Sequence, residues 1–173
     1  MRKLLSTFMT IAILLGFSAC GVGAVEDQPK TTQNPQSDAA QTAACYGFVF
    51  QDTELVPGDC LAAEKLPVPQ YTYRQTNTIL GGEDTFYNFV DIEVIVYNNG
   101  ASSVIRSIMV ISPNLKTPEG LSLGDSTEQV IKLYGNNYVE DGDQWLFSVE
   151  NTCLAVLIQD GLVAGIEYHL TGL

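Results

Sequence analysis

The sequence has 173 residues, of which 46% are hydrophobic, and a formal net charge of −12 from 20 acidic and 8 basic residues. A strongly acidic chain repels nucleic-acid phosphates and anionic lipid headgroups, so the composition argues against a nucleic-acid-binding protein. Residues 1–19 contain two bases and no acid, so a chain that lacked them would carry a charge of −14.

The first residues have the pattern of a bacterial export signal. Arg2 and Lys3 precede the largely apolar residues 4–15, and small residues at positions 18 and 19 suit a signal peptidase. The apolar stretch is shorter than the roughly 20 residues that span a bilayer. We therefore predict that residues 1–19 are a signal peptide and not a transmembrane anchor.

The segment Phe17-Ser-Ala-Cys20 resembles a lipobox, although Leu is more usual than Phe at its first position. The resemblance implies that Cys20 carries a thioether-linked diacylglycerol and becomes the first residue of the mature protein. Lipid chains would then anchor the protein to the outer face of the cell membrane, or to the outer membrane of a diderm cell. The alternative is an ordinary secreted protein cleaved near Ala19 or Ala24.

Residues 20–44 are predicted to be the lipidated cysteine followed by a disordered tether. The stretch is rich in Gln, Thr, Ala, Ser, Asp and Pro and has no aromatic residue, so it cannot bury enough apolar surface to offset its ordering entropy. A single folded domain is expected over residues 45–173. A disulfide between Cys45 and Cys60 is plausible outside the cell, whereas Cys153 lies in an apolar segment and suits a buried thiol.

The expected elements of the first half are an initial strand, a short helix stopped by Pro67 and Pro69, and three further strands. The strands are placed at Tyr46–Phe50, Phe86–Phe89, Ile92–Tyr97 and Val104–Ile111, and the helix at Cys60–Leu66. In the second half, a helix over residues 126–135 should begin with Asp125 as its N-cap and end at Gly135. Three strands are expected to follow it, at Gln144–Val149, Leu154–Ile158 and Val163–Leu170.

The two halves share short matches. Leu55-Val-Pro-Gly-Asp59 parallels Leu121-Ser-Leu-Gly-Asp125 at an offset of 66, and Ile105 and Ile108 match Val163 and Ile166 at an offset of 58. We predict two tandem pseudo-repeats, about 46–111 and 115–171. The expected fold is α+β, an antiparallel sheet of about six or seven strands with short helices on one face.

The segment Thr117–Gly135 is similar to one found before a β-meander in small exported bacterial proteins. Its pattern resembles the β-lactamase-inhibitor-protein-like fold of tandem helix-plus-sheet units, the small outer-membrane assembly lipoproteins, and uncharacterised lipoproteins of Gram-positive anaerobes. The resemblance implies a fold and little about function, because one fold hosts many functions. No contact residue of those proteins can be transferred to this chain.

No catalytic constellation is found in the sequence. His169 is the single histidine, and there is no Gly-x-Ser-x-Gly or Cys-x-x-Cys motif. Acidic runs occur at Glu83-Asp84 and at Glu140–Asp143, and the second suits a solvated loop, with a weak cation site as the alternative. We therefore expect no enzyme activity, cofactor or metal. Tyr71 and Tyr73 alternate, so on an extended segment they would share one face and could bind a peptide or glycan. Core packing is the alternative for the aromatic residues as a group.

The predicted function is a membrane-anchored, non-enzymatic binding or inhibitor-like module that works through the open face of its sheet. The partner would be another protein, a peptide or a glycan. A structural lipoprotein of envelope assembly is the second hypothesis, and an enzyme acting on glycans or peptides is the third.

Overall fold

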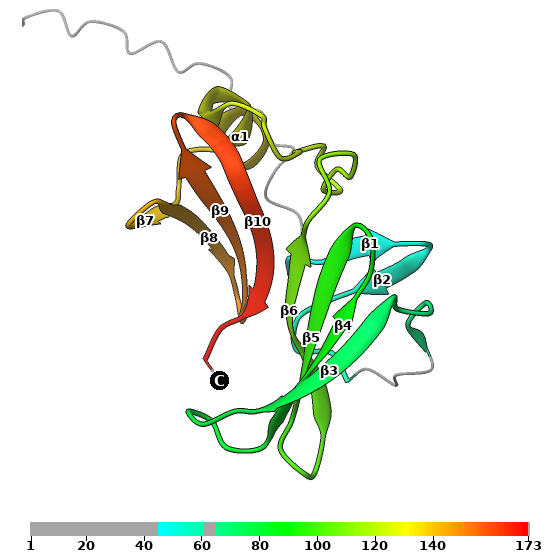
Figure 1. The fold of residues 1–173 in the computed structure, drawn as a ribbon. Coiled ribbons are helices and arrows are strands. Elements are labelled where there is room, and N and C mark those ends of the chain that lie inside the picture. Colours follow the sequence, from blue (N-terminus) through cyan, green and yellow to red (C-terminus); the bar gives the residue numbers. More distant parts are fainter. Residues whose placement is uncertain (1–44, 61–64, 173) are drawn as a thin grey trace, which may run out of the picture. The chain divides into compact units, whose positions relative to one another are not determined.

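The computed structural model describes residues 45–60 and 65–172. All of these residues belong to one compact unit. That unit is mostly β: a two-stranded hairpin, an eight-stranded antiparallel sheet and one helix among the described residues (Figure 1). The elements are β1 (Phe48–Phe50), β2 (Thr53–Leu55), β3 (Tyr71–Thr76), β4 (Glu83–Asn88), β5 (Ile92–Asn98), β6 (Ser103–Val110), α1 (Thr127–Tyr134), β7 (Val139–Asp141), β8 (Gln144–Val149), β9 (Thr152–Gln159) and β10 (Leu162–Leu170).

The large sheet consists of two four-stranded meanders that meet at a central seam. Its strand order is β3-β4-β5-β6-β10-β9-β8-β7, so the last strand of each half pairs with the last strand of the other. The turn at Asp160-Gly161 joins β9 to β10 with positive φ at both residues, as the Asp-Gly pair predicts for a tight hairpin.

The α+β prediction is wrong, because strands outnumber helices by ten to one in the described part of the chain. The large sheet has eight strands in place of the six or seven expected. The edge strands β3 and β7 were missed because every residue in them is exposed. A strand that buries neither face lacks the run of apolar residues that marks a core strand, and the alternation of Tyr71 and Tyr73 in β3 is too short to replace it. The predicted helix at Cys60–Leu66 lies mainly outside the described residues, and Cys60 itself bridges to Val104.

The core lies on one face of the large sheet. There the hairpin β1–β2 and the helix α1 cover side chains from β5, β6, β8, β9 and β10 in one hydrophobic cluster. Phe48 of the hairpin packs on Tyr168 of β10 with ring centroids 5.7 Å apart, and Tyr134 of α1 packs on Phe147 of β8 at 5.4 Å. Among the described elements, the hairpin and the helix both lie on this face, and we call the opposite face the open face.

The helix α1 begins one residue later than its sequence suggests. Ser126, with extended φ and ψ, is the N-cap, whereas the Asp125 carboxylate accepts a hydrogen bond from the Ser122 N–H at 2.8 Å and closes the preceding turn. The Asp125 N-cap prediction is therefore wrong. The expected end of the helix is confirmed: Gly135 has φ 80° and donates its N–H to the Ile131 carbonyl at 2.8 Å.

The positions matched between the halves make equivalent backbone hydrogen bonds. Gly58 donates to the Ile105 carbonyl at 2.8 Å, and Ile105 donates to the Asp59 carbonyl at 3.0 Å. In the second half, the segment Gly124-Asp125 exchanges the same two bonds with Val163, both at 2.8 Å. These pairs follow the two offsets of the sequence match, 66 for the glycine-aspartate step and 58 for the strand.

The seam between β6 and β10 has a register that looks the same from either half. Ile166 pairs with Val110 and Tyr168 with Ile108, on either side of the pair formed by Met109 and Glu167. An offset of 58 relates Met109 to Glu167, and it relates the members of the two flanking pairs crosswise. Equivalent strands thus meet antiparallel about a pseudo-twofold axis at Met109 and Glu167.

The two core tyrosines Tyr134 and Tyr168 differ in the hydrogen bonds that their hydroxyl groups make. The Tyr134 hydroxyl donates to Glu119 at 2.7 Å and lies 2.7 Å from the Thr117 hydroxyl. The Tyr168 hydroxyl is buried and has no hydrogen-bond partner among the described residues. Burial raises the pKa of both phenols, so both stay protonated at neutral pH.

Replacing each of these tyrosines with phenylalanine should therefore change the free energy of unfolding by different amounts. We expect Tyr134→Phe to lower the free energy of unfolding by about 1–2 kcal/mol, since it removes the hydrogen bond to Glu119 and leaves the buried Thr117 hydroxyl with Leu121 as its one remaining partner. Tyr168→Phe should be neutral or slightly stabilising, because it removes an unpaired buried hydroxyl. Urea denaturation followed by tryptophan fluorescence measures both values. An equal loss in the two variants would contradict the assignment.

Candidate functional site

The open face of the sheet carries two parallel rows of side chains set by strand register. One row crosses all eight strands, and its members pair directly with their neighbours: Tyr71, Asn88, Glu93, Met109, Glu167, Ala155, Leu146 and Val139. The adjacent row runs through Tyr73, Phe86, Ile95, Ser107, His169, Cys153 and Ser148. Together the rows form what we call the open-face surface.

Aromatic rings occupy the β3 end of this surface. Tyr73 stacks on Phe86 with centroids 4.4 Å apart and planes 7° apart, and Tyr71 lies 6.4 Å from Tyr73. Tyr71 and Tyr73 are 58% and 43% exposed, so the core-packing alternative does not hold for these two residues. The structure thus places both on one exposed face, as the alternation required, and adds Phe86, which sequence reasoning did not single out.

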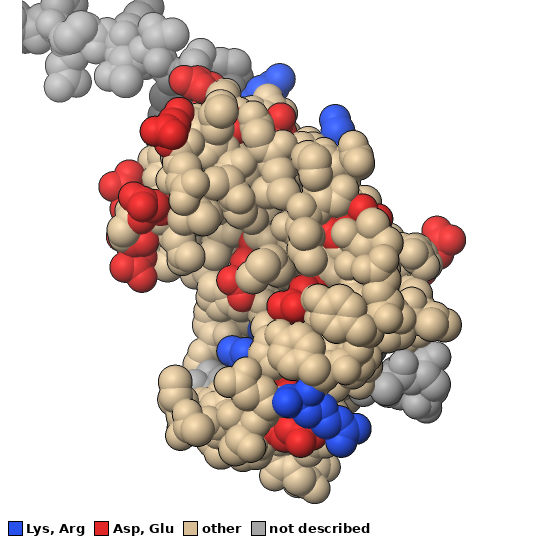
Figure 2. All heavy atoms as spheres, in the orientation of Figure 1, with Lys and Arg blue, Asp and Glu red and all other residues tan. Residues whose placement is uncertain are grey.

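Exposed apolar and acidic side chains continue the surface toward β7. Met109 is 39% and Val139 67% exposed, and Met109 lies between Glu93 and Glu167 on the neighbouring strands. Figure 2 shows acidic side chains over the middle of the sheet and only scattered basic ones. The surface therefore joins aromatic, apolar and negatively charged groups in one band.

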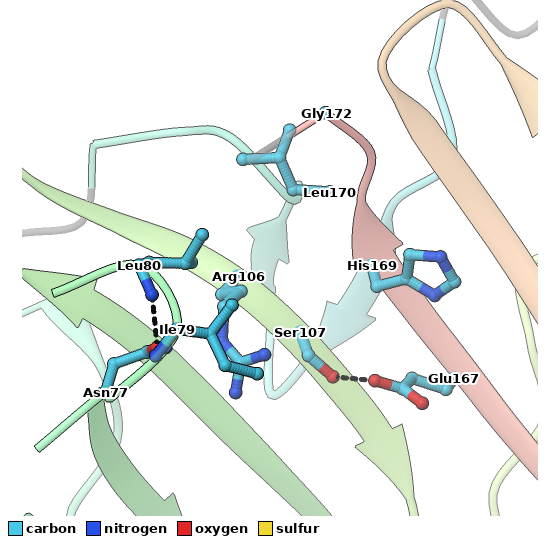
Figure 3. A pocket seen from close by; sticks show the side chains of 9 residues that line it. All are labelled: Asn77, Ile79, Leu80, Arg106, Ser107, Glu167, His169, Leu170 and Gly172. Atoms are coloured by element: carbon cyan, nitrogen blue, oxygen red, sulfur yellow. Dashed lines mark hydrogen bonds between the residues drawn. The ribbon is translucent and has the colours of Figure 1, made fainter. Parts of the chain in front are cut away.

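A pocket of about 420 Å³ opens beside the central seam. It is lined by Asn77, Ile79, Leu80, Arg106, Ser107, Glu167, His169, Leu170 and Gly172 (Figure 3). The loop between β3 and β4 forms one wall. That loop is held by the Asn77 side-chain oxygen, which accepts from the N–H groups of Ile79 and Leu80, and by the Tyr97 hydroxyl, which donates to the Leu80 carbonyl.

Three polar contacts lie in or beside the pocket. Nε of Arg106 lies 3.2 Å from Oδ1 of Asp84, and the side-chain amide of Asn77 donates to Oδ2 of Asp84 at 2.9 Å. Asp84 is only 6% exposed, so its carboxylate is largely removed from solvent. It contacts the pocket through the side chains of Arg106 and Asn77, which line it. On the seam side, the Ser107 hydroxyl donates to Oε1 of Glu167.

The observed groups do not make a familiar hydrolytic centre. Glu167 is the single carboxylate among the described residues that line the pocket, whereas glycoside hydrolysis uses a pair of carboxyl groups. His169 pairs in register with Ser107, but Ser107 gives its hydrogen bond to Glu167. No cluster suited to a metal ion occurs in residues 45–60 and 65–172.

The structure also locates the cysteines and one acidic run that the sequence analysis discussed. Cys45, Cys60 and Cys153 are free thiols, so the structure contains no bond between Cys45 and Cys60, and that disulfide stays a prediction. Cys153 is buried, and burial raises its pKa. The acidic run at Glu140–Asp143 is partly strand β7 and not wholly a loop. Cys20 lies outside the described residues.

Comparison of the chain with protein-family models, with curated proteins and with solved structures found no match. Within the described residues there is no helix of the length and apolar character that a membrane crossing requires. The open-face surface and the pocket are therefore the features of the molecule that bear on its function.

Proposed function

We propose that this protein is an exported, lipid-anchored, non-enzymatic binding module that docks a partner protein on its open-face surface. The export and the anchor rest on the signal-peptide pattern and on Cys20. The docking rests on one observation: on the side of the sheet away from the core, the open-face surface carries exposed apolar and aromatic side chains at both edge strands and at the seam, Tyr71, Tyr73, Val139 and Met109, with buried residues such as Ala155 between them.

The size and chemistry of the band support a protein partner. Neighbouring strands lie about 4.8 Å apart, so eight strands present a surface roughly 34 Å wide, which matches a protein–protein interface better than a small ligand. Tyrosine side chains such as Tyr71 and Tyr73 are typical anchors of such interfaces, because they bury a large area at a small cost in side-chain entropy.

Site-specific photo-crosslinking in intact cells tests this proposal. A benzophenone amino acid at Tyr71 or at Met109 should give a defined crosslinked species on irradiation. The matched controls are Val49 and Ile131, which are 57% and 40% exposed but belong to the hairpin β1–β2 and the helix α1 on the other side of the sheet. Equal crosslinking from all four positions, or crosslinking only from the controls, would contradict a partner on the open-face surface.

A further inference from the structure

The pocket beside the seam contains a charged group that the equivalent position of the second half lacks. Ile95 pairs with Ser107 and Val96 with Ile105, so Arg106 is the extra residue of a β-bulge in β6. The strand β10 has a bulge at Ala164, between Val163 and Gly165, which is the equivalent position at the offset of 58. Since alanine suffices in the second half, the bulge itself does not explain an arginine in the first.

The cost of the arginine also calls for an explanation. Its side chain is 32% exposed, and its partner Asp84 is nearly buried, so both charges have lost much of their hydration. A buried ion pair of this kind contributes little to stability, because desolvation offsets the attraction. Bulges often re-aim a side chain at a functional site. Here the bulge places the guanidinium at the pocket, with its Nε atom 3.2 Å from Oδ1 of Asp84.

The orientation of Arg106 leaves its terminal nitrogens available. Nε lies 3.2 Å from Oδ1 of Asp84 without a hydrogen bond between them, and among the described residues the guanidinium makes no other ion pair. Figure 3 shows it beside Ile79 and Ser107 in the pocket. A guanidinium whose terminal N–H groups face a pocket is suited to a carboxylate, which it can bind with two parallel hydrogen bonds.

A second, opposite charge lines the same pocket. Glu167 accepts one hydrogen bond through Oε1, from Ser107, and within the described part of the chain it belongs to no ion pair. Arg106 and Glu167 are therefore a cation and an anion that share a pocket without pairing with one another. A simple anion would be repelled by Glu167 and by the net charge of −12, and a simple cation by Arg106.

We propose that this pocket binds a zwitterionic ligand of the amino-acid class, either a free amino acid or a short peptide with both termini free. The ligand carboxylate accepts hydrogen bonds from the terminal nitrogens of Arg106, and the ligand ammonium donates to Glu167. Asn77 and Asp84 are positioning residues, since they act on the ligand through Arg106. This inference goes beyond the proposed function and does not depend on a protein partner.

Isothermal titration calorimetry of the wild-type protein with four probes tests the proposal. The probes are glycine and alanine, which carry both charges on one carbon, and dialanine and trialanine, which separate the two charges by increasing distances. At least one should bind, and blocking either end of the best probe should weaken its binding about 10-fold, by N-acetylation or by C-terminal amidation. Absence of binding by all four probes, or equal binding of the blocked forms, would overturn the proposal.

Variants then assign each end of the ligand to a side chain. Arg106→Gln should weaken the best probe about 10-fold and abolish the effect of amidation, whereas Glu167→Gln should do the same for acetylation. Arg106→Lys keeps the charge next to Asp84 and should still bind more weakly, because it lacks the planar fork. Circular dichroism melts establish that each variant is folded.

Two control variants separate the pocket from the overall charge. Arg74→Gln removes a positive charge from an exposed ion pair on β3, and Glu140→Gln removes a negative charge from exposed β7. Both should bind the best probe within about twofold of wild type. If the controls weaken binding as much as the pocket variants, the site is not at Arg106 and Glu167. The photo-crosslinking result is independent of either outcome.

Discussion

Gly82→Ala is expected to lower the free energy of unfolding by about 3 kcal/mol or more, and to leave little folded protein at 37 °C if the wild type is only moderately stable. A Cβ atom at Gly82 would lie 2.3 Å from the Asn98 carbonyl oxygen, which is backbone and cannot turn aside. The residue also has φ +73°, a conformation that alanine adopts at a cost.

The neighbouring glycine provides a matched control for this prediction. Gly81 has φ +74°, and a Cβ there would meet nothing within 4 Å. Gly81→Ala should therefore cost only about 1 kcal/mol, the conformational part of the effect. Urea denaturation of both variants measures the two values. Similar losses in the two variants would contradict the close approach of Gly82 to Asn98. The loop between β3 and β4, which forms one wall of the pocket, would then lie farther from Asn98 in solution.

Cys20→Ser should move the protein from the membrane fraction to the medium or to the soluble periplasmic fraction. Several acyl chains on one residue give stable anchoring, and serine cannot form the thioether. Fractionation of cells expressing the full chain, followed by immunoblotting, measures the shift. Cys45→Ser is the control, since it removes a thiol without touching the lipobox and should leave the protein with the membrane.

Mass spectrometry of the processed N-terminus gives a second measurement of the same prediction. A diacylglycerol-modified cysteine adds a large, defined mass to the first peptide of the wild type, and the Cys20→Ser chain should lack it. Retention of the variant on membranes would contradict lipid anchoring through Cys20.

Elements that bury a face could be predicted from this sequence, and elements that do not could not. The strands β5, β8, β9 and β10 were expected within about two residues of their observed bounds, because each carries branched and aromatic side chains into the core. The edge strand β3 reads Tyr-Thr-Tyr-Arg-Gln-Thr and is exposed throughout. Its partner β4 stabilises it, and no local pattern announces that pairing.

The candidate site was only partly predictable for a related reason. Tyr71 and Tyr73 were found because their alternation lies within one segment. The pocket joins Asn77, Arg106 and Glu167, which come from three separate parts of the chain, and Asp84 contacts it only through Asn77 and Arg106. The one local signal is a charged residue between apolar neighbours in a predicted strand, as at Glu167 between Ile166 and Tyr168. That signal marks the open side of a sheet but not which charges meet there.

The register of the central seam has a consequence for how such a molecule could be assembled. Because the pairs flanking Met109 and Glu167 exchange under the internal twofold, the contact between the halves is isologous, as in a symmetric homodimer. Two copies of a single half-length chain could close the same eight-stranded sheet. Joining them in one polypeptide frees each half to diverge, and the bulge that carries arginine in one half and alanine in the other is such a divergence.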